Sequence, residues 1–118
     1  FVASLEASSH EHFKQWVVKA QEGDTHLTLK ELAPVRLLKN KFYHDVPEAY
    51  AKGATVEELK TLLGRARAKK GMFEGDMDEG ELEIGQVSGL IHDIKPAADI
   101  VQNLMTEFNL AKKEVQGL

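Results

Sequence analysis

The chain has 118 residues, enough for one hydrophobic core but not for two. Its 15 basic and 19 acidic residues give a net charge of -4, and the basic residues are spread along the chain, so we expect no nucleic acid partner. There is no cysteine, which excludes disulfides and a thiol nucleophile. No apolar run approaches the roughly 18 residues of a membrane span, and no signal peptide is recognisable, so we expect a soluble cytoplasmic protein without membrane contact.

The first four residues, Phe1-Val2-Ala3-Ser4, have the β-branched and aromatic character of a strand end. A strand this short needs a sheet beside it to pair its backbone groups, and few partner strands are recognisable downstream. We therefore expect that the chain is a fragment whose sheet lies outside these residues. A trimmed chain or a disordered leader is the alternative.

The first helix is predicted over residues 9–22. Ser8 stands three residues before Glu11, which is the spacing of a capping box, and an apolar face follows at intervals of three and four residues. Gly23 is a natural stop.

The periodicity fades over residues 24–43, which predicts an irregular connection with a short helical turn. A short helix is then predicted from Asp45 to the stop at Gly53, with Pro47 in its first turn.

A second capping box, Thr55 with Glu58, predicts a helix that continues to Gly71. Its polar face is basic. We interpret that face as solvated, with phosphate or partner binding as the alternative. The basic residues are Lys60, Arg65, Arg67, Lys69 and Lys70.

Residues 79–91 are predicted as a helix in which Leu82, Gly85, Gln86 and Gly89 share one face. Each glycine costs about 1 kcal/mol relative to alanine inside a helix, so two on one face indicate a close approach. That approach is either tight helix packing or contact with a cofactor or substrate.

The last helix is predicted to begin at Pro96 and to lose its pattern after Asn109. It carries one continuous apolar face, which predicts that it docks on an apolar surface. The face consists of Ala97, Ile100, Val101, Leu104, Met105 and Phe108.

The sequence shows no catalytic or metal-binding motif. His10 and His12 are two residues apart, on different faces of a helix, and the other three histidines are isolated. The acidic residues at 76–83 lack the ligand spacing of a calcium loop, and no phosphate loop or nucleophile elbow is present. We assign no catalytic residue and no metal ligand.

Several short motifs, in order and spacing, resemble the C-terminal portion of the nitronate monooxygenase family, which includes the flavin-dependent enoyl-[acyl-carrier-protein] reductase II. The resemblance spans nearly the whole chain, and the run from Glu74 to Ile91 is its most specific part. The motifs are Phe1-Val2-Ala3-Ser4-Leu5-Glu6 with His10, Asp24-Thr25, Val35-Arg36 with Lys39-Asn40, Glu74-Gly75-Asp76, and Gly85-Gln86-Val87-Ser88-Gly89-Leu90-Ile91.

The resemblance implies an FMN enzyme built on an eight-stranded β/α (TIM) barrel, with FMN phosphate held by loops that precede Phe1. The chain would then be mostly α, a C-terminal fragment of that barrel. Residues 1–23 would be the end of the eighth strand and its outer helix. Residues 24–71 would be an irregular connection and helical insertion, and residues 72–118 the glycine-containing helix and the C-terminal docking helix.

The resemblance also implies a function. We expect an oxidoreductase that uses FMN and NAD(P)H to reduce an enoyl thioester, a small molecule or one carried by acyl carrier protein. Nitronate oxidation is the alternative within the family, and a non-catalytic helical assembly domain is the alternative outside it. Gly85, Gln86 and Ser88 are the candidate contacts to cofactor or substrate mouth. We expect a homo-oligomer, and we expect these residues alone to be inactive, colourless and self-associating.

Overall fold

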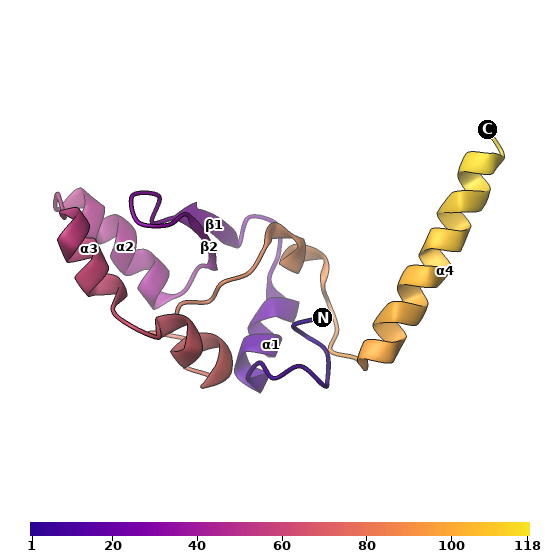
Figure 1. Ribbon diagram of the computed structural model, residues 1–118, viewed down its shortest axis with the longest axis horizontal. Helices are drawn as coiled ribbons and strands as arrows, with labels where there is room; N and C mark the ends of the chain where they lie inside the picture. The colour runs from indigo at the N-terminus through magenta and orange to yellow at the C-terminus, as the bar shows by residue number, and fades with distance from the viewer.

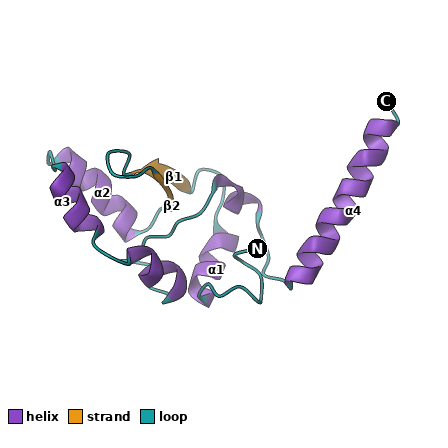
Figure 2. Ribbon diagram, viewed as in Figure 1, coloured by secondary structure: helices purple, strands orange, loops and turns teal.

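Seven short helices and strands gather at one end of the molecule, and one long helix projects from it (Figures 1 and 2). The computed structural model describes residues 1–118, of which 51% are helical. The longest dimension is 57 Å and the shortest is 19 Å. The chain is therefore helix-rich, as predicted, and elongated. None of these helices combines the length and the hydropathy of a membrane-spanning segment.

Helix α1 spans Glu11–Lys19, inside the predicted range. The predicted capping box of Ser8 and Glu11 is wrong, because His10 is the N-cap and its Nδ1 accepts a hydrogen bond from the backbone N–H of His12 at 3.1 Å. The helix ends at Ala20, before the expected stop. The apolar face is confirmed, since Phe13 and Val17 are fully buried.

The predicted irregular connection over residues 24–43 is wrong for most of its length. Strands β1, Thr25–Thr28, and β2, Val35–Leu38, form an antiparallel hairpin with Thr25 opposite Leu38. The short alternation after Asp24 was the only local sign of it, because strand pairing depends on residues about ten positions away.

Helix α2, Lys41–Ala51, begins at the N-cap Asn40, so it starts before the predicted position and places Pro47 in the helix interior. Helix α3, Val56–Leu63, has the predicted capping box. The Thr55 N–H donates to the Glu58 carboxylate at 2.7 Å, and the Glu58 N–H donates to Thr55 Oγ1 at 3.3 Å. The helix stops at Gly64, which has φ 65°, and not at Gly71.

The predicted glycine-containing helix over residues 79–91 is wrong. A short π-helix, η1, spans Lys69–Phe73, and the chain from Gly80 to Gly85 is then non-helical before a single 3-10 helix, η2, at Gln86–Leu90. Glycines lower the intrinsic helix preference here, and tertiary contacts described below hold the extended form. Gly85 and Gly89 therefore do not share a helix face.

Strand β2 separates two hydrophobic clusters. Its neighbouring residues Leu37 and Leu38 point to opposite faces, as alternate strand side chains do, and each enters a different cluster. The first cluster, on the α1 side, contains Ala3, Phe13, Val17, Ala20, Leu38 and Leu82. The second, on the α2 side, contains Leu29, Leu37, Phe42, Tyr43 and Val46.

Helix α4 spans Ala97–Gln116 with Pro96 as its N-cap, so the predicted start is confirmed, while the helix continues past Asn109. None of its residues is buried, and it projects away from the rest of the chain (Figure 1). Its apolar face is half-exposed, for example Leu104 at 54% and Phe108 at 59%. The docking surface predicted for this helix is therefore not supplied by these 118 residues.

The first residues form turns, and their only sheet-like contact is a single parallel bridge between Ser4 and Lys95. The hairpin is the one sheet in the structure. The predicted strand end at residues 1–4 thus has no sheet of its own here.

Candidate functional site

The three predicted site residues lie on a segment, residues 81–90, that crosses from β2 to α1. Leu38 N–H donates to Leu82 O at 2.9 Å, and Ile84 N–H donates to Arg36 O at 3.2 Å. Glu83 forms an antiparallel bridge with Leu37 between these bonds. The first half of the segment is therefore fixed as a short third strand, and η2 continues from it.

Gly85 and Gln86 are exposed at the start of η2. No atom lies within 4 Å of the position that a Cβ on Gly85 would take, so the backbone there is open. The neighbouring Val87 and Leu90 are 60% and 77% exposed. The turn thus presents an accessible backbone, one carboxamide and two apolar side chains, a combination suited to an organic ligand that is partly apolar and partly hydrogen-bonding.

Ser88 differs from its neighbours because it is fully buried, and its hydroxyl has no hydrogen-bond partner in the chain. Its backbone N–H donates to Gly85 O at 3.1 Å. A buried hydroxyl without a partner costs about 1–3 kcal/mol. Ser88 is therefore a cost to the fold of the segment, and its hydroxyl is enclosed by the chain itself.

The close backbone approach predicted from the two glycines occurs at Gly89. A Cβ at this position would lie 3.2 Å from the backbone of Gln21 and of Glu22, just beyond the end of α1. The packing interpretation therefore holds for Gly89, while Gly85 is open.

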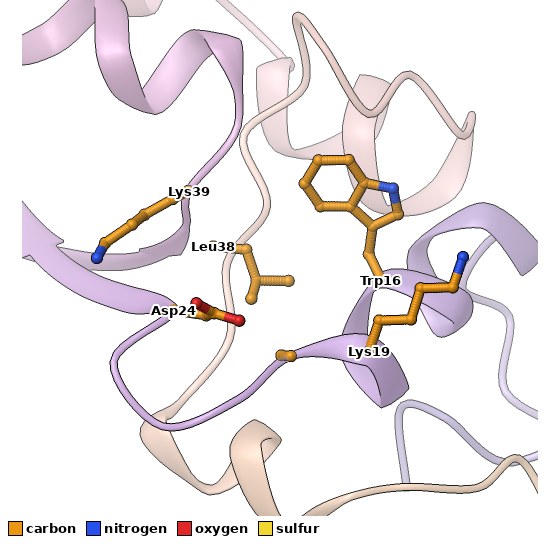
Figure 3. A pocket seen from close by; sticks show the side chains of 6 residues that line it. Trp16, Lys19, Asp24, Leu38 and Lys39 are labelled. Carbon is orange, nitrogen blue, oxygen red and sulfur yellow. The ribbon is translucent and has the colours of Figure 1, made fainter.

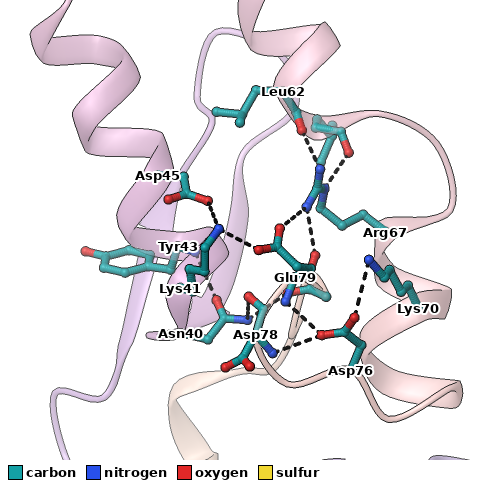
Figure 4. Close-up of polar contacts among 12 residues, drawn as sticks. Asn40, Lys41, Tyr43, Asp45, Leu62, Arg67, Lys70, Asp76, Asp78 and Glu79 are labelled. Atoms are coloured by element: carbon teal, nitrogen blue, oxygen red, sulfur yellow. Dashed lines mark hydrogen bonds and ion pairs between the residues drawn. The ribbon is translucent and has the colours of Figure 1, made fainter.

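Asn40 fixes the loop that leads into the segment (Figure 4). Its Nδ2 donates to the carbonyls of Met77 at 2.9 Å, Asp78 at 3.3 Å and Gly80 at 2.8 Å. Its Oδ1 accepts from the N–H of Tyr43 at 2.9 Å and caps α2. One buried side chain thus joins the start of α2 to residues 77–80.

Arg67 holds the same loop from the other side (Figure 4). Its guanidinium donates to the carbonyls of Leu62, Leu63 and Glu79, each at 2.8 Å. It also lies 4.4 Å from the centroid of the Phe42 ring, which is cation–π range. This basic residue is thus structural, and not part of a solvated face as predicted.

Two carboxylates, those of Asp76 and Glu79, also hold this loop in place. Hydrogen bonds from the N–H groups of Glu79 and Asp78, together with Lys70, hold the pKa of Asp76 below its ordinary value. The Lys41 ammonium, 2.5 Å away, lowers the pKa of Glu79. Both side chains are therefore ionised at neutral pH and act as anchors.

A shallow pocket of about 260 Å³ opens beside the end of α1 (Figure 3). Trp16 and Lys19 of α1 line one wall, and Leu38 and Lys39 line the other, with Ala20 and Asp24 between them. Asp24 Oδ2 accepts from the Gln21 N–H at 2.8 Å, so its carboxylate is already used in a turn. The pocket carries no acid and base pair positioned for catalysis.

The two neighbouring histidines serve the α1 N-terminus. His12 Nδ1 lies 3.2 Å from Gly75 O, and the His10 and His12 rings meet edge-on with centroids 4.6 Å apart. No three His, Asp or Glu side chains gather as metal ligands. Sequence reasoning missed the structural roles of Asn40 and Arg67, whose partners are mostly carbonyls distant in sequence. The one local signal was the residue type at position 40, because asparagine is favoured as a helix N-cap.

Fold and site together define a helix-rich segment that carries a binding turn and the network that fixes it. Residues 1–107 match the family model described as nitronate monooxygenase, so the chain belongs to the nitronate monooxygenase family, and the resemblance drawn from its motifs is confirmed. Members of this family are oxidoreductases that generally depend on a flavin.

Two solved structures are similar to this chain. One is FabK from Thermotoga maritima, with 30% sequence identity and a TM-score of 0.88, over 98% of this chain and 37% of that one. The other is a mutant of FabK from Thermotoga maritima, with 28% identity and a TM-score of 0.81, over 98% of this chain and 34% of that one. The chain thus spans about a third of the length of these structures.

Proposed function

We propose that this chain is the C-terminal part of an FMN-dependent enoyl-[acyl-carrier-protein] reductase of the second type, which uses NAD(P)H in the cytoplasm. The observation that carries the proposal is the similarity to FabK over 98% of this chain at a TM-score of 0.88, with 30% identity. The rest of the protein would supply the β/α barrel.

The segment 81–90 fits a role at the cofactor or substrate mouth. Its open backbone at Gly85 and the exposed carboxamide of Gln86 are groups that could hold the flavin ring or the substrate beside it, while Ser88 lies buried in the same turn. Bound FMN would supply hydride transfer, which no side chain of this chain provides. The task of these residues is to bind and orient.

Asn40 and Arg67 support that task. Because they fix residues 77–80 through carbonyl groups, they also fix where the segment begins. A site whose supporting side chains are fixed by several hydrogen bonds is positioned more precisely than one on a free loop.

The second candidate is nitronate oxidation, favoured by the description of the matching family model. The two reactions share the flavin and differ in the substrate and in the final electron acceptor. The residues of segment 81–90 are compatible with both.

The test uses the full-length protein. We expect a yellow protein with flavin absorbance near 450 nm that oxidises NADH or NADPH only when a trans-2-enoyl thioester is added, without consuming oxygen. Oxygen consumption with a nitronate, and no turnover of the thioester, would instead establish the second candidate. A colourless protein that binds no added FMN would contradict both and favour a non-catalytic assembly domain.

A further inference from the structure

A cavity of about 330 Å³ lies on the opposite side of segment 81–90 from α1. It is bounded by the loop between β1 and β2, by the end of α3 and by the start of the segment. Its size is at the lower end of small-molecule pockets. Its walls are apolar except for two carboxylates; they are Leu29, Leu32, Ala33, Pro34, Val35, Leu63, Glu81 and Glu83.

The extended backbone aims both carboxylates into this cavity. Leu82 is fully buried in the cluster on the α1 side, so the flanking Glu81 and Glu83 point to the other face. The N–H of Glu81 donates to Arg67 O at 3.0 Å, which fixes the backbone at this point.

The Glu81 carboxylate has no partner within the chain. The residue is only 8% exposed and lines the cavity, and its carboxylate makes no hydrogen bond or ion pair. The nearest cation, Arg67, directs its guanidinium to the carbonyls of Leu62, Leu63 and Glu79. Burial, and then the charge of Glu83, raise the pKa of Glu81 to about 7, while Arg67 opposes the rise.

We propose that this cavity binds a small organic ammonium ion, with its charged head beside Glu81 and its apolar tail among Leu29, Val35 and Leu63. A buried carboxylate without a counter-ion favours a cation that can donate hydrogen bonds to it. The apolar walls favour a ligand with a hydrocarbon body. A bare Ca²⁺ or Mg²⁺ fits less well, because such ions need about six oxygen ligands and the cavity offers two carboxylates.

The probe is hexylammonium, added to full-length protein with labelled Leu and Val methyl groups and followed by NMR. We expect saturable shifts in the methyl signals of Leu29, Val35 and Leu63 at neutral pH or above. The neutral isostere 1-hexanol should bind at least about tenfold more weakly, and hexanoate should not bind, because they lack the positive charge.

Two variants test where the charged head and the apolar tail of the probe lie. Glu81→Gln keeps the shape of the side chain and should weaken hexylammonium binding at least about tenfold, without changing the affinity for 1-hexanol. Ala33→Phe fills the cavity from the exposed loop, leaves the carboxylates in place and should abolish the shifts. Glu114→Gln, on the exposed face of α4, is the matched control and should bind as the unaltered protein does.

Three results would overturn the proposal. They are equal binding of hexylammonium by Glu81→Gln and the control, equal affinity for hexylammonium and 1-hexanol, and no saturable shift up to about 10 mM probe. The proposal is independent of the enzymatic function, because it is read from methyl signals, whereas the flavin is read from its absorbance.

Discussion

Replacing Glu81 with glutamine should stabilise the protein, and by an amount that depends on pH. Below pH 4.5, the ordinary value for this carboxyl, Glu81 is protonated in both the folded and the unfolded chain. Between pH 4.5 and about 7 the unfolded chain releases the proton while the folded chain keeps it, so stability falls as pH rises. Above about pH 7 the side chain is charged in the folded chain as well, and the loss of folding stability is complete.

The magnitude follows from the difference between the two pKa values. A tenfold change in proton affinity is worth about 1.4 kcal/mol, so a rise from 4.5 to about 7 sets an upper limit of about 3 kcal/mol. The cavity is open to water, which screens the carboxylate, and we therefore expect about 1–2 kcal/mol. Glu81→Gln should exceed the unaltered protein in unfolding free energy by this amount at pH 8 and by almost nothing at pH 4.

The assay is urea unfolding across this pH range, with Glu114→Gln as the control because its side chain is exposed. The control should follow the unaltered protein within about 0.5 kcal/mol at every pH. A Glu81→Gln advantage that is the same at pH 4 and pH 8, or a variant less stable at pH 8, would refute the assignment of a desolvated carboxyl to this position.

Three further predictions concern the segment and its anchors. Asn40→Ala removes a helix cap and three donated hydrogen bonds, so it should lower the free energy of unfolding in urea by about 2–4 kcal/mol. The control Asn109→Ala, on exposed α4, should change the free energy of unfolding by less than about 0.5 kcal/mol. Gly80→Ala should lower the melting temperature severely, because its Cβ would lie 2.2 Å from a backbone atom. Gly85→Ala should leave the melting temperature nearly unchanged, because no atom lies within 4 Å of its Cβ position. If the turn contacts flavin, Gly85→Ala should alter the affinity for FMN. Ser88→Ala should leave the flavin-free protein as stable or more stable by up to about 1 kcal/mol, and a clear loss of stability there would show that the hydroxyl has a partner inside the chain.

The features recognised in the sequence are those whose causes lie within a few residues. The capping box of Thr55 and Glu58 needs only residues three apart, and it forms as predicted. The helix after Pro96 follows from a continuous apolar period, and it also forms. The family resemblance likewise depends on short motifs in order, and residues 1–107 confirm it.

The candidate site could be predicted from the sequence only in part. Gly85, Gln86 and Ser88 do lie on one turn, but the pattern suggested a helix face where the structure has an extended entry and one 3-10 turn. What decides between them is Leu82, whose side chain enters a core formed by residues 3–38 and whose carbonyl pairs with Leu38.

Only the tertiary structure decided the hairpin, the anchors and the buried carboxylate. Arg67 looks like one more cation on a basic stretch until its carbonyl partners are in place, and Glu81 looks like one more acid until apolar walls surround it. Local sequence patterns predict helix caps and the apolar periodicity of helices, because these features depend on neighbours along the chain. Pairing, burial and the cost of an unpartnered charge depend on residues brought together from far apart, and no window of sequence contains them.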